Sequence, residues 1–239
     1  MKLDILYEDE HYVFVNKPSG VLTIPDRHNA ELPNIKSALL RLYPTIFVVH
    51  RLDRDTSGCL CFAKDEQTHA YMSALFEKRE VDKYYLGIVH GCPIETHQLI
   101  EAAIMEHPVV KGRMIVHAKQ GKYSATEYEV VENFGRYALL QFKLLTGRTH
   151  QIRVHMQHIE HPLVCDATYG SPDPVFISSL KKNFKLSKWT EEEKPILHRL
   201  ALHAFKLSFK TEAGQLLTIE APLPKDMNAM LNQCRKWLK

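Results

Sequence analysis

The residues most suited to catalysis lie in one short polar run between two apolar segments. The run HRLDRDTSG at 50–58 follows the apolar letters FVV and precedes CLCFA. Strands at both ends fix such a loop, and loops on a rigid scaffold commonly carry functional residues. Asp53 stands between Arg51 and Arg54, whose positive charges favour its ionised form. We interpret Asp53 as a candidate nucleophile, base or electrostatic stabiliser, with a structural salt bridge as the alternative.

A second run, LTGRTHQIRVHM at 145–156, joins the end of a strand to the start of a helix. Free backbone N–H groups at a helix start, together with Arg148 and Arg153, are suited to binding a phosphate or carboxylate. The two arginines are five residues apart, so we expect one to face solvent and the other to turn inward. An inward arginine needs an acidic partner, and Asp53 is the candidate that we expect.

A third run, KYYL at 83–86, begins a strand. Side chains alternate along a strand, so Tyr84 and Tyr85 are expected on opposite faces, one of them in the core. By composition alone, either ring could simply fill the strand.

Two further patterns are weak. The letters DTSG at 55–58 resemble half of an aspartic-protease site, but that chemistry needs two carboxylates and the chain has one copy. Histidines cluster at positions 150, 155, 158 and 161. His155 and His158 lie three apart on a helical face, and no carboxylate or cysteine completes a metal set. We expect RNA contact or a polar helix surface there, and no metal.

Composition limits the class of protein. The chain has 239 residues, of which 45% are hydrophobic, so it can bury a core and is not disordered. It has no long apolar run and no signal peptide, which indicates a soluble cytoplasmic protein. Its five cysteines, an odd number without a CxxC pair, argue against a disulfide framework. The net charge is only +3, but residues 111–155 hold eight positive and three negative side chains. This surplus suits a phosphate backbone or a solvated polar face.

The periodicity predicts strands interleaved irregularly with helices, an α+β fold without an internal domain boundary. Asp65 is expected to cap a helix over 65–79, with Ala70, Ala74 and Leu75 on one face. The other expected elements are two short strands in 5–15, a strand at 21–25, a helix over 34–42, strands in 47–64 and 83–91, an antiparallel pair in 124–147, a helix over 149–159, a hairpin turned at 213–214 and a C-terminal helix.

Together these runs resemble the RluA-type family of RNA pseudouridine synthases. The motifs appear in the family's order from residue 4 to about 210: EDEHYVFVNKPSGVLTIP, HRLDRDTSG, KYYLGIVHG, LLTGRTHQIRVHM and HPLVCDATYG. One departure is Cys165, where the family pattern has Gly before Asp166. It puts the geometry of that loop in doubt.

The resemblance implies a central mixed, largely antiparallel sheet with flanking helices and an RNA-binding cleft. It implies one catalytic domain over 1–239, without a separate N-terminal RNA-binding module. The implied activity is isomerisation of uridines in structured RNA, either large-subunit ribosomal RNA or transfer RNA or both, with no cofactor and no metal. We expect no membrane association, no obligatory protein partner and a monomer.

The resemblance also assigns roles. Asp53 becomes the catalytic aspartate, Tyr85 the ring that stacks on uracil and helps remove the proton from carbon 5, and Arg153 the basic partner of Asp53. Arg54 is expected to fill the space left by the flipped base. The expected RNA contacts are Arg51, Arg54, Lys111, Arg113, Lys122, Arg148 and His150, with further phosphate contacts from 181–188. Two alternatives remain: an RNA-binding protein without catalysis, and a glycoside hydrolase that uses Asp53 and Asp55.

Overall fold

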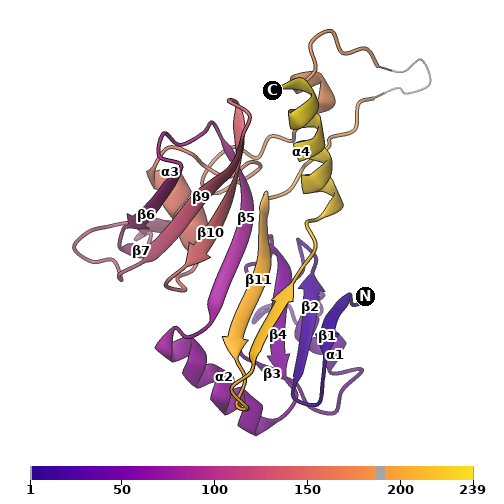
Figure 1. The fold of residues 1–239 in the computed structure, drawn as a ribbon, viewed down its shortest axis with the longest axis vertical. Coiled ribbons are helices and arrows are strands. Elements are labelled where there is room, and N and C mark those ends of the chain that lie inside the picture. The colour runs from indigo at the N-terminus through magenta and orange to yellow at the C-terminus, as the bar shows by residue number, and fades with distance from the viewer. Residues whose placement is uncertain (1, 187–191, 239) are drawn as a thin grey trace. The chain divides into compact units, whose positions relative to one another are not determined.

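The chain forms a large mixed β-sheet with few flanking helices in the computed structural model, which describes residues 2–186 and 192–238 (Figure 1). The predicted α+β class and mixed sheet are confirmed. Two compact units share the chain: Met1–Tyr85, Lys143–Leu145 and His203–Pro222 form unit 1, and Leu86–Phe142, Thr146–Leu202 and Leu223–Lys239 form unit 2. Each unit is assembled from three separate segments, which is why the sequence offered no single boundary.

Unit 1 contains the sheet order β1 (Ile5–Glu8), β2 (Tyr12–Lys17), β4 (Ser57–Ala63) and β11 (Leu202–Lys210). β2 runs antiparallel to β4, whereas β11 pairs with β4 in parallel through His203 and Ala204. Two further strands are β3 (Phe47–Val48), paired with β4, and β12 (Leu216–Glu220), paired with β11. β11 and β12 form the predicted hairpin, with Gly214 at φ 77° in its turn.

Both faces of β2 and β4 are buried, so these strands alternate between two apolar clusters. One face packs against helix α2 (Glu66–Lys78) and carries Tyr12, Phe14, Cys59 and Cys61. The other face packs against helix α1 (Ile35–Leu39) and carries Val13, Val15, Leu60 and Phe62. The two cysteines share one face, as the sequence predicts, and all five cysteines of the chain are free.

The predicted cap of α2 is confirmed, whereas its predicted buried face is right for Leu75 and wrong for Ala70. The Asp65 carboxylate accepts a 2.7 Å hydrogen bond from the Thr68 backbone N–H. Thr68, Met72 and Leu75 form the buried stripe, at the i, i+4 and i+7 spacing of a helix, while Ala70 is exposed. The side chain of Met72 is larger than that of alanine, so it fills more of the space between the helix and the sheet.

The expected strand at 21–25 is not formed. Leu22 makes a single parallel bridge to Asn34, and the carbonyls of Leu22 and Thr23 accept from the first N–H groups of α1. Asn34 caps the same helix by accepting from Ser37. The segment therefore completes a helix start instead of a sheet edge.

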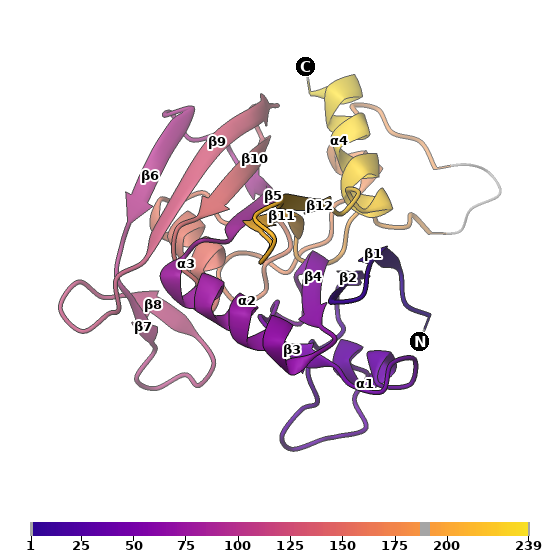
Figure 2. The same cartoon turned by 60° about the horizontal axis from the view of Figure 1, so that its bottom comes forward.

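Unit 2 continues the strand order with β5 (Asp82–His90), β10 (Tyr137–Leu144), β9 (Ala125–Asn133) and β6 (His97–Glu101). β6 and β9 are antiparallel, and β9 joins β10 through a tight turn at Gly135. Figure 2 shows β7 (Ile104–Glu106) and β8 (Met114–Val116) as a separate two-stranded ribbon. The first residues of β5 and the last of β10 belong to unit 1.

Two α-helices and a short 3₁₀ turn (Ile177–Ser179) complete unit 2. α3 (Gln151–His158) buries its first six residues, and Val154 packs with Ile104 and Tyr169. α4 (Lys225–Trp237) packs an apolar stripe of Met227, Met230, Leu231 and Cys234 against strand residues such as Ile88 and Leu139. Within the described ranges, no helix has the length and apolar character needed to cross a bilayer.

Candidate active site

The polar run 50–58 forms the turn that leads from β3 into β4. The N–H of Thr56 donates to the Asp53 carbonyl over 3.2 Å, which closes the turn. Leu52 and Thr56 are buried on either side of it, while Asp53 keeps part of its surface open. The buried hydroxyl of Thr23 donates to the Leu52 carbonyl at 3.0 Å and accepts from the Leu52 N–H at 3.2 Å. The backbone before Asp53 is thus held on both sides.

Lys17 holds the backbone after Asp53. Its side chain is fully buried at the end of β2, and its ammonium donates to the carbonyls of Arg54 at 2.8 Å, Val21 at 2.6 Å and Pro18 at 3.0 Å. A buried ammonium is costly unless its donors are satisfied, so these carbonyls must stay in place around it. The sequence analysis assigned Lys17 no role.

The turn 18–20 adds further contacts to the same loop. The Gly20 N–H donates to the Arg54 carbonyl at 2.9 Å, and the Arg54 guanidinium Nε donates to the Gly20 carbonyl at 3.2 Å. The Ser19 hydroxyl donates to the Asp55 carbonyl at 2.6 Å. Two loops that are far apart in the sequence therefore form one hydrogen-bonded unit, which we call the Lys17 clamp: Lys17–Val21 and Asp53–Asp55.

The C-terminal end of the run is fixed by β11. The Ser57 hydroxyl lies 3.0 Å from Nδ1 of the buried His203, whose Nε2–H donates to the Ala221 carbonyl at 3.2 Å. Gly58 has φ 118°, and a Cβ there would lie 2.2 Å from the Ala204 carbonyl oxygen. Only glycine permits this close approach of β4 to β11.

His50 fixes the beginning of the run. Its ring stacks on Phe76 with centroids 5.0 Å apart, and its Nε2 accepts from the Cys61 N–H at 3.1 Å. Burial lowers the pKa of His50 to about 3, and the positive charge of Lys83 acts in the same direction. His50 is therefore neutral at physiological pH, as its acceptor role requires.

Tyr85 lies within electrostatic reach of Asp53. Its ring packs with the α1-side cluster that contains Leu52 and Ala204. Burial raises the pKa of the Tyr85 phenol, and the negative charge of Asp53 raises it further. The neighbouring Tyr84 has different partners: the ammonium groups of Lys206 and Lys143 lie 4.5 Å and 5.5 Å from the centre of its ring. The two rings therefore have different surroundings, and the partly buried Tyr85 is the one that packs against the apolar cluster.

Arg153 turns inward, as predicted, and is paired with an acid that the sequence analysis did not consider. Its Nε and one terminal nitrogen donate to the two carboxylate oxygens of Asp166 at 2.8 Å and 2.7 Å. Only 5% of Arg153 and 1% of Asp166 is exposed, and the guanidinium lies 4.9 Å from the centre of the Tyr169 ring. The requirement for an acidic partner is thus met inside unit 2, and it does not by itself point to Asp53. The pairing of Arg153 with Asp53 stays a prediction.

The loop that supplies Asp166 has a strained backbone at Cys165. Cys165 adopts the left-handed φ of 56° that a glycine would take without strain. The Asp166 carboxylate also accepts from the N–H groups of Thr168 and Tyr169, at 3.0 Å and 3.1 Å. These bonds, with the buried ion pair, hold a residue type that disfavours this backbone region.

The start of α3 is more fully occupied than the sequence predicts. The N–H of Arg148, expected to be free for a phosphate, donates to the Gln151 side-chain carbonyl at 3.0 Å. The same oxygen accepts from the Thr146 hydroxyl at 2.7 Å. The Gln151 amide donates to the Ala125 carbonyl and the Thr126 hydroxyl, at 3.0 Å and 2.9 Å. Because the Gln151 side chain hydrogen-bonds backbone groups at the start of β9 and just before α3, fewer backbone N–H groups remain to bind an anion.

The expectation of a polar or RNA-facing surface is wrong for His155. This residue is fully buried; its Nε2–H donates to the Ala102 carbonyl at 3.0 Å, and its Nδ1 accepts from Thr126 at 2.9 Å. Burial lowers the pKa of His155, so its ring is neutral. His158 is exposed on the same helix. Within 2–186 and 192–238, no three His, Cys, Asp or Glu side chains gather as a metal site.

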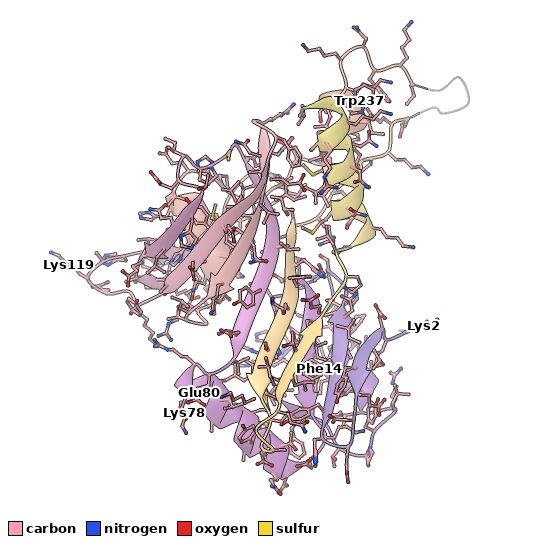
Figure 3. The ribbon with its side chains drawn as sticks, in the orientation of Figure 1. Lys2, Phe14, Lys78, Glu80, Lys119 and Trp237 are labelled. Atoms are coloured by element: carbon pink, nitrogen blue, oxygen red, sulfur yellow. The ribbon has the colours of Figure 1, made fainter. Side chains whose placement is uncertain are left out.

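Of the basic residues expected to contact RNA, four are exposed, whereas Arg113, Arg148 and His150 are partly buried. Arg51 and Arg54 are exposed beside Asp53. In unit 2, Arg148 Nε donates to the Tyr123 carbonyl, next to Lys122. His150 hydrogen-bonds the Tyr169 hydroxyl, which accepts from the Met114 N–H, next to Arg113. Lys111 is exposed in the β7–β8 turn, and Figure 3 shows Lys119 at the outer end of the loop after β8. Of the expected stretch 181–188, residues 187 and 188 lie outside the described residues.

A family profile described as RNA pseudouridylate synthase matches residues 11–158, which include the clamp, Tyr85 and Arg153. The chain belongs to this family. The resemblance to RluA-type synthases is confirmed by curated relatives as well. The synthase is thus an isomerase that forms pseudouridine in RNA, as the motifs predict.

Several relatives of the synthase cover nearly its whole length. It is 37% identical over 98% of the chain to "Ribosomal large subunit pseudouridine synthase D" of Nitrosomonas europaea, of which it spans 65%. It is 35% identical to the protein of the same name from Escherichia coli K12, of which it spans 71%. Two human structures share its fold. "RNA Pseudouridylate Synthase Domain Containing 4" has a TM-score of 0.75 at 24% identity, covering 97% of this chain and 93% of that one. "RNA Pseudouridylate Synthase Domain Containing 1" has 0.68 at 26%, covering 98% and 95%.

Removing the charge of Asp166 should destabilise the synthase strongly. Asp166→Asn keeps the volume but removes the charge that accepts two hydrogen bonds from the buried Arg153 guanidinium, and breaking a buried ion pair costs about 3–5 kcal/mol. Urea unfolding should show this loss, and the exposed Asp173→Asn variant from the same loop should unfold like the wild type. Equal stability of the Asp166 and Asp173 variants would show that the ion pair contributes nothing to the fold.

Acidification should destabilise the synthase in part through His50. Its folded pKa of about 3 lies below the unfolded value of 6.5, so protons bind the unfolded chain preferentially as the pH falls from 6.5 towards 3. The free energy of unfolding should drop by at most about 1.4 kcal/mol per pH unit from this group. His50→Gln, which retains an acceptor for Cys61, should flatten the dependence when urea unfolding at pH 7 and pH 5 is compared. An unchanged slope in this variant would contradict the buried neutral imidazole.

Proposed function

We propose that this synthase converts selected uridines of large-subunit ribosomal RNA to pseudouridine, with Asp53 as the catalytic carboxylate. The substrate class is taken from the names of the curated relatives, which contain the words "ribosomal large subunit". Transfer RNA is the alternative substrate. We also propose that the protein acts in the cytoplasm as a monomer, without an obligatory protein partner.

One observation carries the assignment of Asp53. Its backbone is held by Thr23 on one side and by the buried Lys17 on the other, while its side chain keeps access to solvent. A carboxylate fixed in this way needs little reorganisation when a substrate arrives. If Asp53 served only in a structural salt bridge, the contacts that Thr23 and Lys17 make to the backbone on both sides of it would not be needed.

The reaction itself is an internal rearrangement. The bond between N1 of uracil and C1′ of ribose breaks, the base rotates, and a bond forms between C5 and C1′. The proton lost from C5 is matched by one gained at N1, so atoms and electrons balance without a cofactor or a metal. A stacked base cannot rotate, so the uridine must first leave the helix. Asp53 either attacks C1′ or removes the 2′ proton, and exposed Arg54 beside it is suited to fill the vacated space.

Tyr85 is the neighbouring group suited to hold the base. An aromatic ring beside the carboxylate can stack on uracil, as in other pockets that receive flipped bases. Its raised pKa keeps the phenol protonated, because burial and the charge of Asp53 both oppose the phenolate. In the free enzyme this favours stacking and hydrogen bonding over proton removal by a phenolate. Arg153 is proposed to act on Asp53 through its charge, in addition to its ion pair with Asp166.

The two rival functions are less well supported. A glycoside hydrolase needs a second carboxylate across the sugar. Asp55 lies in the same tight turn as Asp53, and its carbonyl is held by Ser19. An RNA-binding protein without catalysis would not need a fixed carboxylate beside a raised-pKa tyrosine.

Loss of the Asp53 charge should abolish pseudouridine formation and leave the fold intact. Asp53→Asn should lower turnover by at least about 10³-fold, a loss typical of groups that act on the reacting atoms. The Asp55→Asn variant, from the same exposed turn, is the matched control and should keep substantial turnover. Release of tritium from 5-tritiated uridine in ribosomal and transfer RNA measures both variants and identifies the substrate.

A turnover above a few per cent in Asp53→Asn would refute the assignment. Wild-type turnover on transfer RNA alone would refute the ribosomal substrate while leaving Asp53 in place.

A further inference from the structure

A basic and aromatic surface lies at the C-terminal end of α4, within unit 2. The apolar stripe of α4 is buried, but its last turn presents Arg235, Lys236 and Trp237 to solvent. Figure 3 shows Trp237 at this end of the helix, among side chains with nitrogen tips. The indole is 36% exposed, so a large flat ring remains available at the surface.

Two lysines from different segments converge on this ring. Lys236 belongs to the helix itself, and Lys181 follows the 3₁₀ turn 177–179; each ammonium lies 4.9 Å from the centre of the Trp237 ring. The indole N–H donates to the Gln233 side chain at 3.0 Å, which fixes the orientation of the ring. The ring is thus both oriented and surrounded by positive charge.

The neighbouring side chains keep this surface positive. Lys182 and Lys185 are exposed next to Lys181. Two acids lie nearby: Glu132 forms an ion pair with Arg235, and the Glu193 carboxylate accepts from the Ser178 N–H at 2.8 Å. Arg136 donates to the Ser179 carbonyl at 2.8 Å and so ties the segment before Lys181 to the β9–β10 turn. We call Lys181, Lys182, Lys185, Lys236 and Trp237 the α4 surface.

Helix electrostatics alone does not account for this surface. Cations at a helix C-terminus complement the macrodipole, which explains Arg235 and Lys236. It does not explain a half-exposed indole with a lysine from another segment above it. A flat ring flanked by cations is the arrangement that proteins use for single-stranded nucleic acid, where bases stack and phosphates pair with lysines.

We propose that the α4 surface binds a single-stranded segment of the substrate RNA outside the uridine that is modified. This inference rests on the proposed function, because it assumes an RNA substrate. One base stacks on Trp237 in the place of an ammonium group that lies over the ring in the free protein, and the phosphates on either side contact Lys181 and Lys236. The contact is independent of sequence, since every base has a flat face. It contributes to affinity and leaves the chemical step unchanged.

The direct test follows Trp237 fluorescence. The chain has two tryptophans, so Trp189→Phe leaves Trp237 as the single reporter. The probe is an oligouridylate of about ten nucleotides, which fits the usual span of a single-strand site. Stacking should quench the emission saturably. Lys181→Gln with Lys236→Gln should weaken binding and reduce the salt slope by about 1.4, at about 0.7 per lost contact.

A second measurement connects the surface to turnover. On a substrate RNA with a single-stranded extension, Trp237→Leu should lower kcat/KM about tenfold and leave kcat unchanged. On the stem-loop without the extension, the variant should have the kcat/KM of the wild type. Lys2→Gln with Lys78→Gln, two exposed lysines labelled in Figure 3, is the control and should behave like the wild type.

Three outcomes would overturn the inference. If oligouridylate leaves the fluorescence unchanged while the wild type forms pseudouridine, the proposed function stands and the α4 surface does not bind RNA. Quenching by polyglutamate at equal charge, but not by oligouridylate, would assign the surface to an acidic protein. Quenching by vesicles of anionic lipid alone would assign it to a membrane. Absence of turnover on every RNA, with quenching by oligouridylate, would refute the proposed function and keep the surface.

Discussion

The buried ammonium of Lys17 is the constraint on which the proposed catalytic turn depends. It donates to three carbonyls, and one of them belongs to Arg54, next to Asp53. A charge in the interior is tolerated only when its hydrogen bonds are satisfied, so the positions of these carbonyls are coupled to one another. The turn around Asp53 therefore inherits its geometry from β2, a strand buried on both faces. The partly exposed Asp53 is thus supported by a strand that is packed on both faces.

Unit 2 uses the same principle with different residues. Arg153 and Asp166 form a buried bidentate ion pair, and Gln151 and His155 satisfy the ends of β9 and the backbone near β6. Each member leaves an uncompensated charge or an unpaired polar group if its partner is removed. Such a network specifies one position for α3, and with it the surface near Arg148. The basic side chains around it can then present their charges to a phosphate backbone at low cost in reorganisation.

The sequence predicted the parts of the structure that follow from local patterns. Helix α2 with its Asp65 cap, the strand that becomes β4 and the hairpin at Gly214 all follow from periodicity and turn chemistry. The motif order identified the family, and the loop that carries Asp53 was identified from polarity between apolar runs. These signals are encoded within a few consecutive residues, so a single sequence reveals them.

The contacts that were missed join segments far apart in the chain. Nothing near Lys17 in the sequence indicates that it reaches the Arg54 carbonyl, 37 residues away. The ion pair of Arg153 with Asp166 was missed, although Asp166 directly follows the unusual Cys165; the pairing of Arg153 with Asp53 stays a prediction. His155 was interpreted as part of a polar helix face, because the sequence does not show that its partners Ala102 and Thr126 lie beside it. A buried lysine or histidine becomes recognisable only when its acceptors are known.

The most direct test of this account is the single-turnover rate of Lys17→Met at saturating RNA. Methionine fills a similar volume but donates no hydrogen bond, so three carbonyls lose their partner and the fold loses about 3 kcal/mol or more. In the folded fraction, measured by near-ultraviolet circular dichroism at low temperature, we expect the rate to fall by about 10²-fold or more, because displacement of the carboxylate by about 1 Å suffices for such a loss. A folded Lys17→Met enzyme with the wild-type rate would contradict the claim that this buried charge positions Asp53.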